Sequence, residues 1–233
     1  MESDRHPETT LESSVARPNE RGSQVRAASG NTPQAIVLRT NLRGFRRAVE
    51  LLGSQAFVSM LDEYVEFVSQ VTRRNGGEVF KVDTVAMTLG FGLGEAKPKA
   101  RAEVAVRTAK QLLDGFEQLS NRWRECVDAR IALGVGIHQG EVIAASLASG
   151  SNRGPALVGD TVNVAARLAE RARAGEAILS ASIREALRDQ LPGLEIKPLG
   201  GLSFAGRTRH VDIYCIPRAD RLDLGEGRRE STR

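Results

Sequence analysis

The stretch Val158-Gly-Asp-Thr-Val-Asn-Val-Ala-Ala-Arg-Leu168 predicts an amphipathic helix that carries two polar side chains of chemical interest. Asn163 and Arg167 are four residues apart, so a helix brings their amide and guanidinium groups side by side. The apolar positions fall on another face that can pack against a sheet: Val162, Ala165, Leu168, Ala169 and Ala172. The pair therefore points into a cleft or toward a partner, or it is an ordinary solvated stripe.

The boundaries of this helix follow from glycines and a polar cap. We expect the chain to enter the helix through Gly159, with Asp160 or Thr161 as the N-cap. Gly175 is expected to stop it.

Composition indicates a single domain of ordinary size with an aliphatic core. The chain has 233 residues, of which 41% are hydrophobic and 4% aromatic. Its two cysteines, Cys126 and Cys215, have no metal-ligand or redox spacing, which is typical of a reduced protein. The first residues resemble no secretory signal, and no run of 18 apolar residues occurs. We therefore expect a cytoplasmic protein without membrane insertion.

The net charge of +4 does not indicate a nucleic-acid-binding protein. By count, residues 1–33 carry a net charge of −1 and residues 217–233 a net charge of +1. The remaining excess is spread over the middle of the chain without a cluster of basic and aromatic residues. We predict no nucleic-acid partner.

The order of patterns along the chain predicts an α+β fold between two tails. Residues 1–33 and 217–233 are polar and charged, so both are expected to be disordered, with one domain at 34–216. The predicted strands are 35–40, 78–82, 85–89, 129–138, 141–145, 177–179, 194–204 and 210–216. The predicted helices are a short one ending at about 52, then 54–74, 98–119, the helix entered through Gly159 that stops near Gly175, and 182–187. This order predicts a mostly antiparallel sheet with helices on one face, elaborated from a ferredoxin-like core.

Two glycine clusters are not dinucleotide-binding loops. The cluster at 90–94 lacks the required spacing, and the cluster at 134–140 lies in predicted strands, where glycine serves close packing or twist. Gln139-Gly140 is predicted to turn a hairpin. His138, beside that turn, is predicted to be structural.

Five runs, in this order, resemble the class III adenylate/guanylate cyclase catalytic domain. They cover residues 35–216 and are strongest in the helix described first. The runs are Val37-Leu-Arg-Thr-Asn-Leu-Arg-Gly-Phe45, Asn75-Gly-Gly-Glu-Val-Phe-Lys81, Gly136-Ile-His-Gln-Gly-Glu-Val142, Gly159-Asp-Thr-Val-Asn-Val-Ala-Ala-Arg-Leu168 and Leu199-Gly-Gly-Leu-Ser-Phe-Ala-Gly206.

The resemblance implies a ferredoxin-like-derived cyclase fold and a known reaction type. In that reaction the ribose 3′-hydroxyl of a nucleoside triphosphate attacks its own α-phosphate and expels pyrophosphate, with two metal ions on the attacking and leaving oxygens. Family members form antiparallel dimers with the site between subunits. One subunit supplies two metal-binding aspartates, and the other supplies a base-reading lysine, a ribose-orienting asparagine and a phosphate-stabilising arginine.

The resemblance assigns most of the second set to this chain. Asn163 and Arg167 stand at the catalytic asparagine and arginine positions, and Lys81 stands at the base-reading lysine. On its own residues, Lys81 is equally compatible with a solvated lysine at a strand end. Ala156 replaces the family's second base-reading residue. Another family lysine aligns with Ala205, for which the nearby Arg207 is expected to compensate in binding the substrate.

The resemblance finds the first set missing. Asn41 and Val85 stand where the family has its two metal-binding aspartates. A Mg²⁺ site wants carboxylate oxygens in near-ideal geometry, which valine cannot supply. Asp83 lies two residues away and is expected to serve only if the turn is rebuilt. We therefore predict no metal or cofactor bound by this chain alone, with Mg²⁺ or Mn²⁺ held only alongside a metal-bearing partner.

Three functional hypotheses follow. The first is a cyclase-homology protein of intracellular signalling that lacks autonomous activity, as a homodimer or heterodimer, with ATP or GTP as a candidate ligand. The second is the half of a heterodimeric cyclase that supplies Lys81, Asn163 and Arg167. The third is a pure protein-interaction or dimerisation module.

Overall fold

The computed structural model describes residues 34–93, 98–147, 154–188, 191, 193–203 and 210–218. Its helices are α1 (Phe45–Arg74), α2 (Pro98–Arg124), α3 (Asp160–Arg171) and α4 (Ala181–Leu187). Its strands are β1 (Gln34–Arg43), β2 (Glu78–Asp83), β3 (Ala86–Phe91), β4 (Ala132–Glu141), β5 (Ile143–Leu147), β6 (Gly154–Val158), β7 (Ala177–Ser180), β8 (Lys197–Leu202) and β9 (Val211–Ile216). Most of the predicted tails, residues 1–33 and 219–233, lie outside the described residues.

Strand β1 is an interior strand of a seven-stranded sheet of order β2-β3-β1-β4-β7-β9-β8. It pairs antiparallel with β3 on one side and with β4 on the other, and β4 and β7 form a parallel pair. The remaining pairs are antiparallel, so the predicted α+β class and mostly antiparallel sheet are confirmed.

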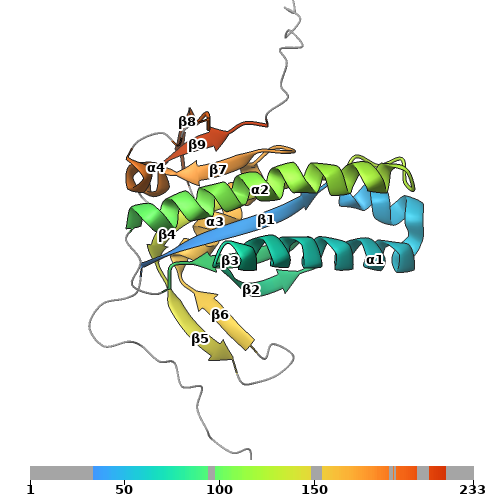
Figure 1. The fold of residues 1–233 in the computed structure, drawn as a ribbon, viewed down its shortest axis with the longest axis horizontal. Helices are drawn as coiled ribbons and strands as arrows, with labels where there is room; N and C mark the ends of the chain where they lie inside the picture. Colours follow the sequence, from blue (N-terminus) through green and yellow to red (C-terminus); the bar gives the residue numbers. More distant parts are fainter. Residues whose placement is uncertain are drawn as a thin grey trace, which may run out of the picture.

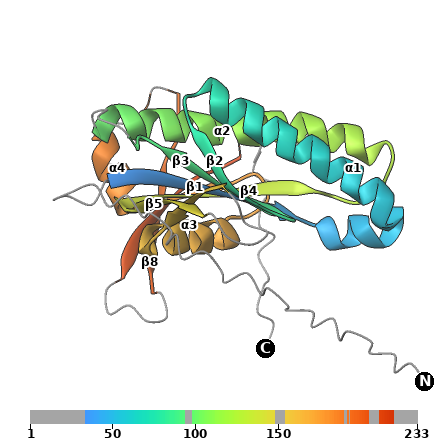
Figure 2. The same cartoon turned by 90° about the horizontal axis from the view of Figure 1, so that it is seen from below.

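Helices cover both faces of this sheet, so the prediction of helices on one face was wrong. Helices α1 and α2 run side by side over one face, where Ile36 and Leu38 of β1 contribute to the main core (Figure 1). Helix α3 lies on the opposite face (Figure 2). It contacts β1 and β4 and packs there with Ala35 and Val37. Because β1 is apolar at consecutive positions rather than at alternate ones, both of its faces require a cover.

The first part of α1, residues 45–52, is separated from the rest of the helix by Gly53. This residue has φ 74° and ψ 169°, values that are not helical. The two predicted helices, one ending at Leu52 and one beginning at Ser54, are therefore confirmed, and glycine suits the break because it has no Cβ to clash at positive φ.

The hairpin predicted at Gln139-Gly140 was wrong. Strand β4 continues through both residues, where Ala35 of β1 pairs with Gly140. The chain bends afterwards at the buried Val142, and β5 pairs with β6 in a separate two-stranded sheet (Figure 1). Pairing with β1 keeps Gln139 and Gly140 extended, although their composition is typical of a turn. Strand β6 was not predicted.

Candidate functional site

Helix α3 approaches β4 very closely because β4 carries glycines beneath it. A Cβ atom at Gly136 would lie 2.2 Å from the carbonyl oxygen of Ala165 and 2.3 Å from the amide nitrogen of Ala169. Gly134 meets the same helix near Ala172. The prediction that this glycine cluster serves close packing is confirmed, and the packing fixes the position of α3 on the sheet.

Asn163 and Arg167 lie on the exposed side of α3, one turn apart. The opposite side is buried through Thr161, Val164, Ala165, Leu168 and Ala169. Val162, expected on the buried face, is half-buried. The pair is thus brought together as the spacing indicated, on a helix anchored by its other side, while its catalytic role stays a prediction.

The N-cap of α3 is Gly159, so the expected cap at Asp160 or Thr161 was wrong. Gly159 has φ 143° and ψ 167°, which disfavours any residue with a side chain, and no side chain caps the helix. The hydroxyl of Thr161 instead donates a hydrogen bond of 2.7 Å to the carbonyl of Glu141, which fastens the first turn of α3 to the end of β4.

Arg43 of β1 closes the other end of α3. Its guanidinium donates hydrogen bonds of 2.8 Å to the carbonyl oxygens of Ala169 and Ala172, and another to that of Glu170. These carbonyls have no partner within the helix, so a cation there also suits the helix dipole. Helix α3 ends at Arg171, before the predicted stop at Gly175.

Asn41 and Val85, the two positions assigned to metal-binding aspartates, lie on neighbouring chain segments. Asn41 is half-buried and pairs with Ala86, and the amide of Leu42 donates a 2.7 Å hydrogen bond to the carbonyl of Val85. The Val85 side chain packs against the main core. The two positions that the resemblance assigns to metal ligands thus lie together at the start of β3. The side chain of Asn41 is an amide and that of Val85 is an alkyl group.

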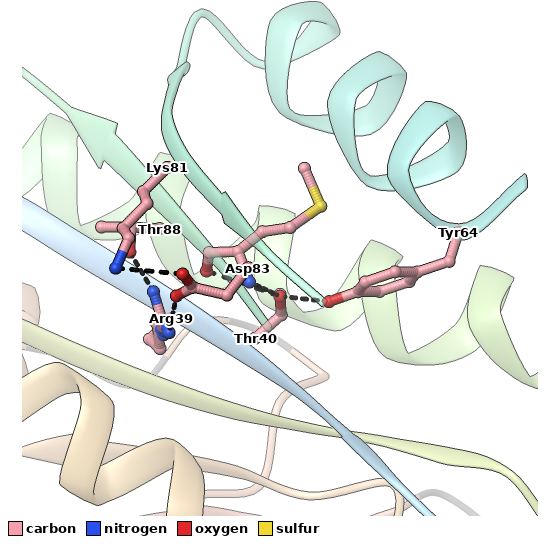
Figure 3. A network of polar contacts seen from close by, with 7 residues as sticks. Arg39, Thr40, Tyr64, Lys81, Asp83 and Thr88 are labelled. Carbon is pink, nitrogen blue, oxygen red and sulfur yellow. Dashed lines mark hydrogen bonds and ion pairs between the residues drawn. The ribbon is translucent and has the colours of Figure 1, made fainter. Parts of the chain in front are cut away.

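Lys81, the predicted base-reading lysine, is bound to Asp83 within its own strand. Its Nζ lies 3.0 Å from Oδ1 of Asp83, and the other carboxylate oxygen accepts a hydrogen bond from Arg39 of β1 (Figure 3). Arg39 also donates to the Thr88 hydroxyl on β3. The network therefore crosses three strands.

Electrostatics keep the Asp83 carboxylate ionised. Partial burial alone would raise the pKa of Asp83, but the hydrogen bonds from Arg39 and Lys81 outweigh burial and hold this pKa below its usual value. The Asp83 carboxylate is therefore already paired with two cations of the chain, Arg39 and Lys81.

The neighbouring residue on β1, Thr40, belongs to the other face of the sheet. Its hydroxyl lies 2.6 Å from the Tyr64 hydroxyl of α1 and accepts a hydrogen bond from the Met87 amide (Figure 3). Burial raises the pKa of Tyr64, so the phenol stays neutral. This pair is part of the core beneath the site.

The sequence did not reveal the ion pair between Arg39 and Asp83. The sequence did contain a signal, because Arg39 is a charged residue inside the apolar run 35–40. In the structure its side chain is only 16% exposed. A charged side chain that is largely withdrawn from solvent requires a partner. Its partner is 44 positions away along the chain, which only the strand register specifies.

The remaining predicted positions have mixed outcomes. Ala156 is half-buried on β6, a strand that lies against β2. Arg207 and Ala205 lie outside the described residues. Nδ1 of His138 lies 2.7 Å from the Ser180 hydroxyl, in keeping with a structural role. His138 and Glu141 of β4 also line a groove of about 430 Å³, which extends to the first residues of α3.

The described residues do not fit a magnesium site. Neither Asn41 nor Val85 offers a carboxylate, and Asp83 is held by Arg39 and Lys81. Within the described ranges, no three His, Cys, Asp or Glu side chains are grouped to hold a metal ion. Nor does any helix in these ranges combine the length and apolar character needed to cross a bilayer.

Residues 28–217 match the family described as adenylate and guanylate cyclase catalytic domain. Adenylate cyclase 1 of Rhizobium meliloti is 26% identical over 181 residues, covering 76% of this chain and 26% of that protein. The adenylate cyclase of Anabaena cylindrica is 24% identical over 145 residues, covering 62% of this chain and 28% of that protein. The chain thus spans about a quarter of the length of each of these relatives.

Solved cyclase structures share the fold. The adenylyl cyclase CyaB from P. aeruginosa superposes with a TM-score of 0.73 at 24% identity, covering 82% of this chain and 97% of that one. The guanylate cyclase domain of RhGC from Catenaria anguillulae, solved in complex with GTP, gives a TM-score of 0.64 at 19% identity, covering 80% and 97%.

Proposed function

The chain belongs to the adenylate and guanylate cyclase catalytic domain family, and we propose that it is a signalling module of that family without cyclase activity of its own. The observation that supports this most directly is the pair Asn41 and Val85, which meet at the start of β3 without a carboxylate. By the resemblance, these are the metal-binding positions.

The chemistry explains why this pair matters. Intramolecular displacement at an α-phosphate needs charge neutralisation on the attacking and leaving oxygens, which two metal ions supply when carboxylates hold them. An amide is a weak ligand without charge, and Val85 is an alkyl side chain that packs against the core. Asp83 is neutralised by Arg39 and Lys81, so recruiting it would break both contacts.

The test is a cyclase assay of the purified chain with ATP or GTP and Mg²⁺ or Mn²⁺. We expect no cyclic nucleotide above a blank. The matched control is Arg167→Ala prepared in the same way, which identifies any contaminating cyclase. Product made by the wild-type chain and lost in the variant would overturn the proposal.

A second candidate function is supported by the exposed pair on α3. Asn163 and Arg167 are side by side, so the amide can orient a ribose while the guanidinium neutralises phosphate charge. Together with Lys81, they would complete a site whose carboxylates and metal come from another cyclase-type chain. The guanylyl cyclase domain of the RhoGC fusion protein from Blastocladiella emersonii is a non-canonical dimer, and the RhGC domain was solved with GTP, which supports a dimer of some kind and a nucleoside triphosphate as ligand here.

This candidate is tested by mixing. Adding a metal-bearing cyclase chain whose own catalytic arginine has been removed should produce cyclic nucleotide only with the wild-type chain, and Arg167→Ala should abolish it. Activity that persists with Arg167→Ala would contradict the assignment. Titration of ATP and GTP without turnover is a separate measurement, in which no binding under any condition would favour a pure interaction module.

A further inference from the structure

Three polar side chains from three adjacent strands form a cross-strand row on one face of the sheet. Lys81 of β2 is the register partner of Thr88 of β3, and Thr88 is the register partner of Arg39 of β1. Side chains directly opposite one another across a ladder share a face of the sheet. The row ends at Gly136 of β4, against which α3 packs.

The Asp83 carboxylate lies where the two cations of this row converge. Oδ2 accepts from the Arg39 guanidinium and Oδ1 lies 3.0 Å from the Lys81 ammonium (Figure 3). A guanidinium and an ammonium that converge on one anionic group are cations of the kind that proteins use to bind phosphate or carboxylate. The Thr88 hydroxyl accepts a hydrogen bond from the same guanidinium and so helps to hold it in place.

Exposure decreases from the outside of this network to its inside. The side chain of Lys81 is 59% exposed, that of Asp83 32% and that of Arg39 16%. Arg39 is thus the shielded cation beneath the carboxylate, and Lys81 is the exposed one at the surface. With Asp83 in place, the three charges sum to +1, whereas without its charge they sum to +2 in the same small area.

We propose that Asp83 is an internal counter-anion that occupies an anion site formed by Arg39 and Lys81, and thereby weakens the binding of phosphate-bearing ligands to this face. A ligand phosphate gains the same donors only by displacing the carboxylate. The inference rests on these contacts and stands whether or not the chain participates in cyclisation.

The test compares two charge-equivalent variants. Asp83→Asn removes the counter-anion, and Asp114→Asn removes an aspartate that also pairs with a lysine, Lys110, but on an exposed turn of α2. The probe is inorganic tripolyphosphate, titrated calorimetrically without metal ions at low ionic strength. We expect Asp83→Asn to bind roughly tenfold more tightly than wild type, and Asp114→Asn to stay within about twofold, because only the first change releases converging cations. Equal gains in both variants, or no gain or a loss in Asp83→Asn, would overturn the proposal.

A second variant assigns the gain to this site. In Asp83→Asn combined with Lys81→Met, the added affinity should fall back to within about twofold of wild type, because one of the two cations is gone. Persistence of the full gain would overturn the assignment to Lys81. Thermal unfolding of each variant with and without tripolyphosphate provides an independent readout, since a ligand that binds the folded state raises the midpoint.

Discussion

The β1 side of the candidate site and the α3 side differ in how their polar groups are held. On the β1 side, Arg39 and Lys81 both bind the Asp83 carboxylate, one on each oxygen, so little of it remains available to a ligand. On the α3 side, Asn163 and Arg167 project from an exposed helix face whose opposite side is fully packed. The polar groups on α3 thus remain exposed to a ligand, whereas the charged groups on the β1 side are paired with one another within the chain.

The largest effect is expected where α3 meets the sheet. Gly136→Ala should lower the free energy of unfolding by about 3 kcal/mol or more, because the new Cβ meets backbone atoms that cannot move independently. Gly201→Ala is the control, since the nearest atom to its Cβ would be 3.5 Å away. Urea unfolding compares the two, and equal losses would contradict the close seating of α3.

A smaller effect is expected on the β1 side. Arg39→Met should cost about 2 kcal/mol, because it leaves a partly buried carboxylate without its principal donor. Lys81→Met removes the exposed partner of the same carboxylate and should cost less than about 1 kcal/mol. Denaturant unfolding measures both variants. A larger loss of unfolding free energy for Lys81→Met than for Arg39→Met would contradict the conclusion that Arg39 is the principal partner of Asp83.

The pH dependence of stability should isolate Asp83. Its pKa in the folded state lies below the ordinary value of 3.8, so its ion pairs stabilise the fold above that pH and are lost as the pH falls toward the lower, folded-state pKa. Wild type should therefore exceed Asp83→Asn by about 1 kcal/mol at pH 7, and the difference should vanish in acid. Thermal or urea unfolding across pH 2 to 7 measures it; a difference that grows in acid would show that the sign is wrong.

The smallest effect is expected at the exposed pair. Asn163→Ala should change the free energy of unfolding by less than about 0.5 kcal/mol, as surface substitutions do. Leu168→Ala is the control, because Leu168 lies on the fully buried face of the same helix. It should lower the free energy of unfolding by about 2 to 5 kcal/mol. A substantial loss in Asn163→Ala would mean that the amide supports the fold instead of serving a ligand.

Local patterns in the sequence were sufficient for several features. The break at Gly53, the helix bearing Asn163 and Arg167, and the tight packing at Gly134 and Gly136 each follow from properties of a few neighbouring residues. Such features depend on backbone freedom and on helical periodicity, which short stretches encode.

Features that depend on long-range register could not be predicted in this way. Gln139-Gly140 has the composition of a turn but stays extended because β1 pairs along it. The link between Arg39 and Asp83 likewise needs the alignment of three strands. Each depends on partners tens of residues away, whose pairing local propensity does not encode.

Arg43 joins the two sides of the site in a way that bears on local opening. It lies two residues after Asn41 on β1, and its guanidinium binds the last carbonyls of α3. Local opening of α3 must break these bonds and expose the buried contacts with β4, so it should require nearly the free energy of opening the central sheet. Amide hydrogen exchange in α3 should then be as slow as in β1, and the exposed pair would present its amide and guanidinium from a helix that does not fray.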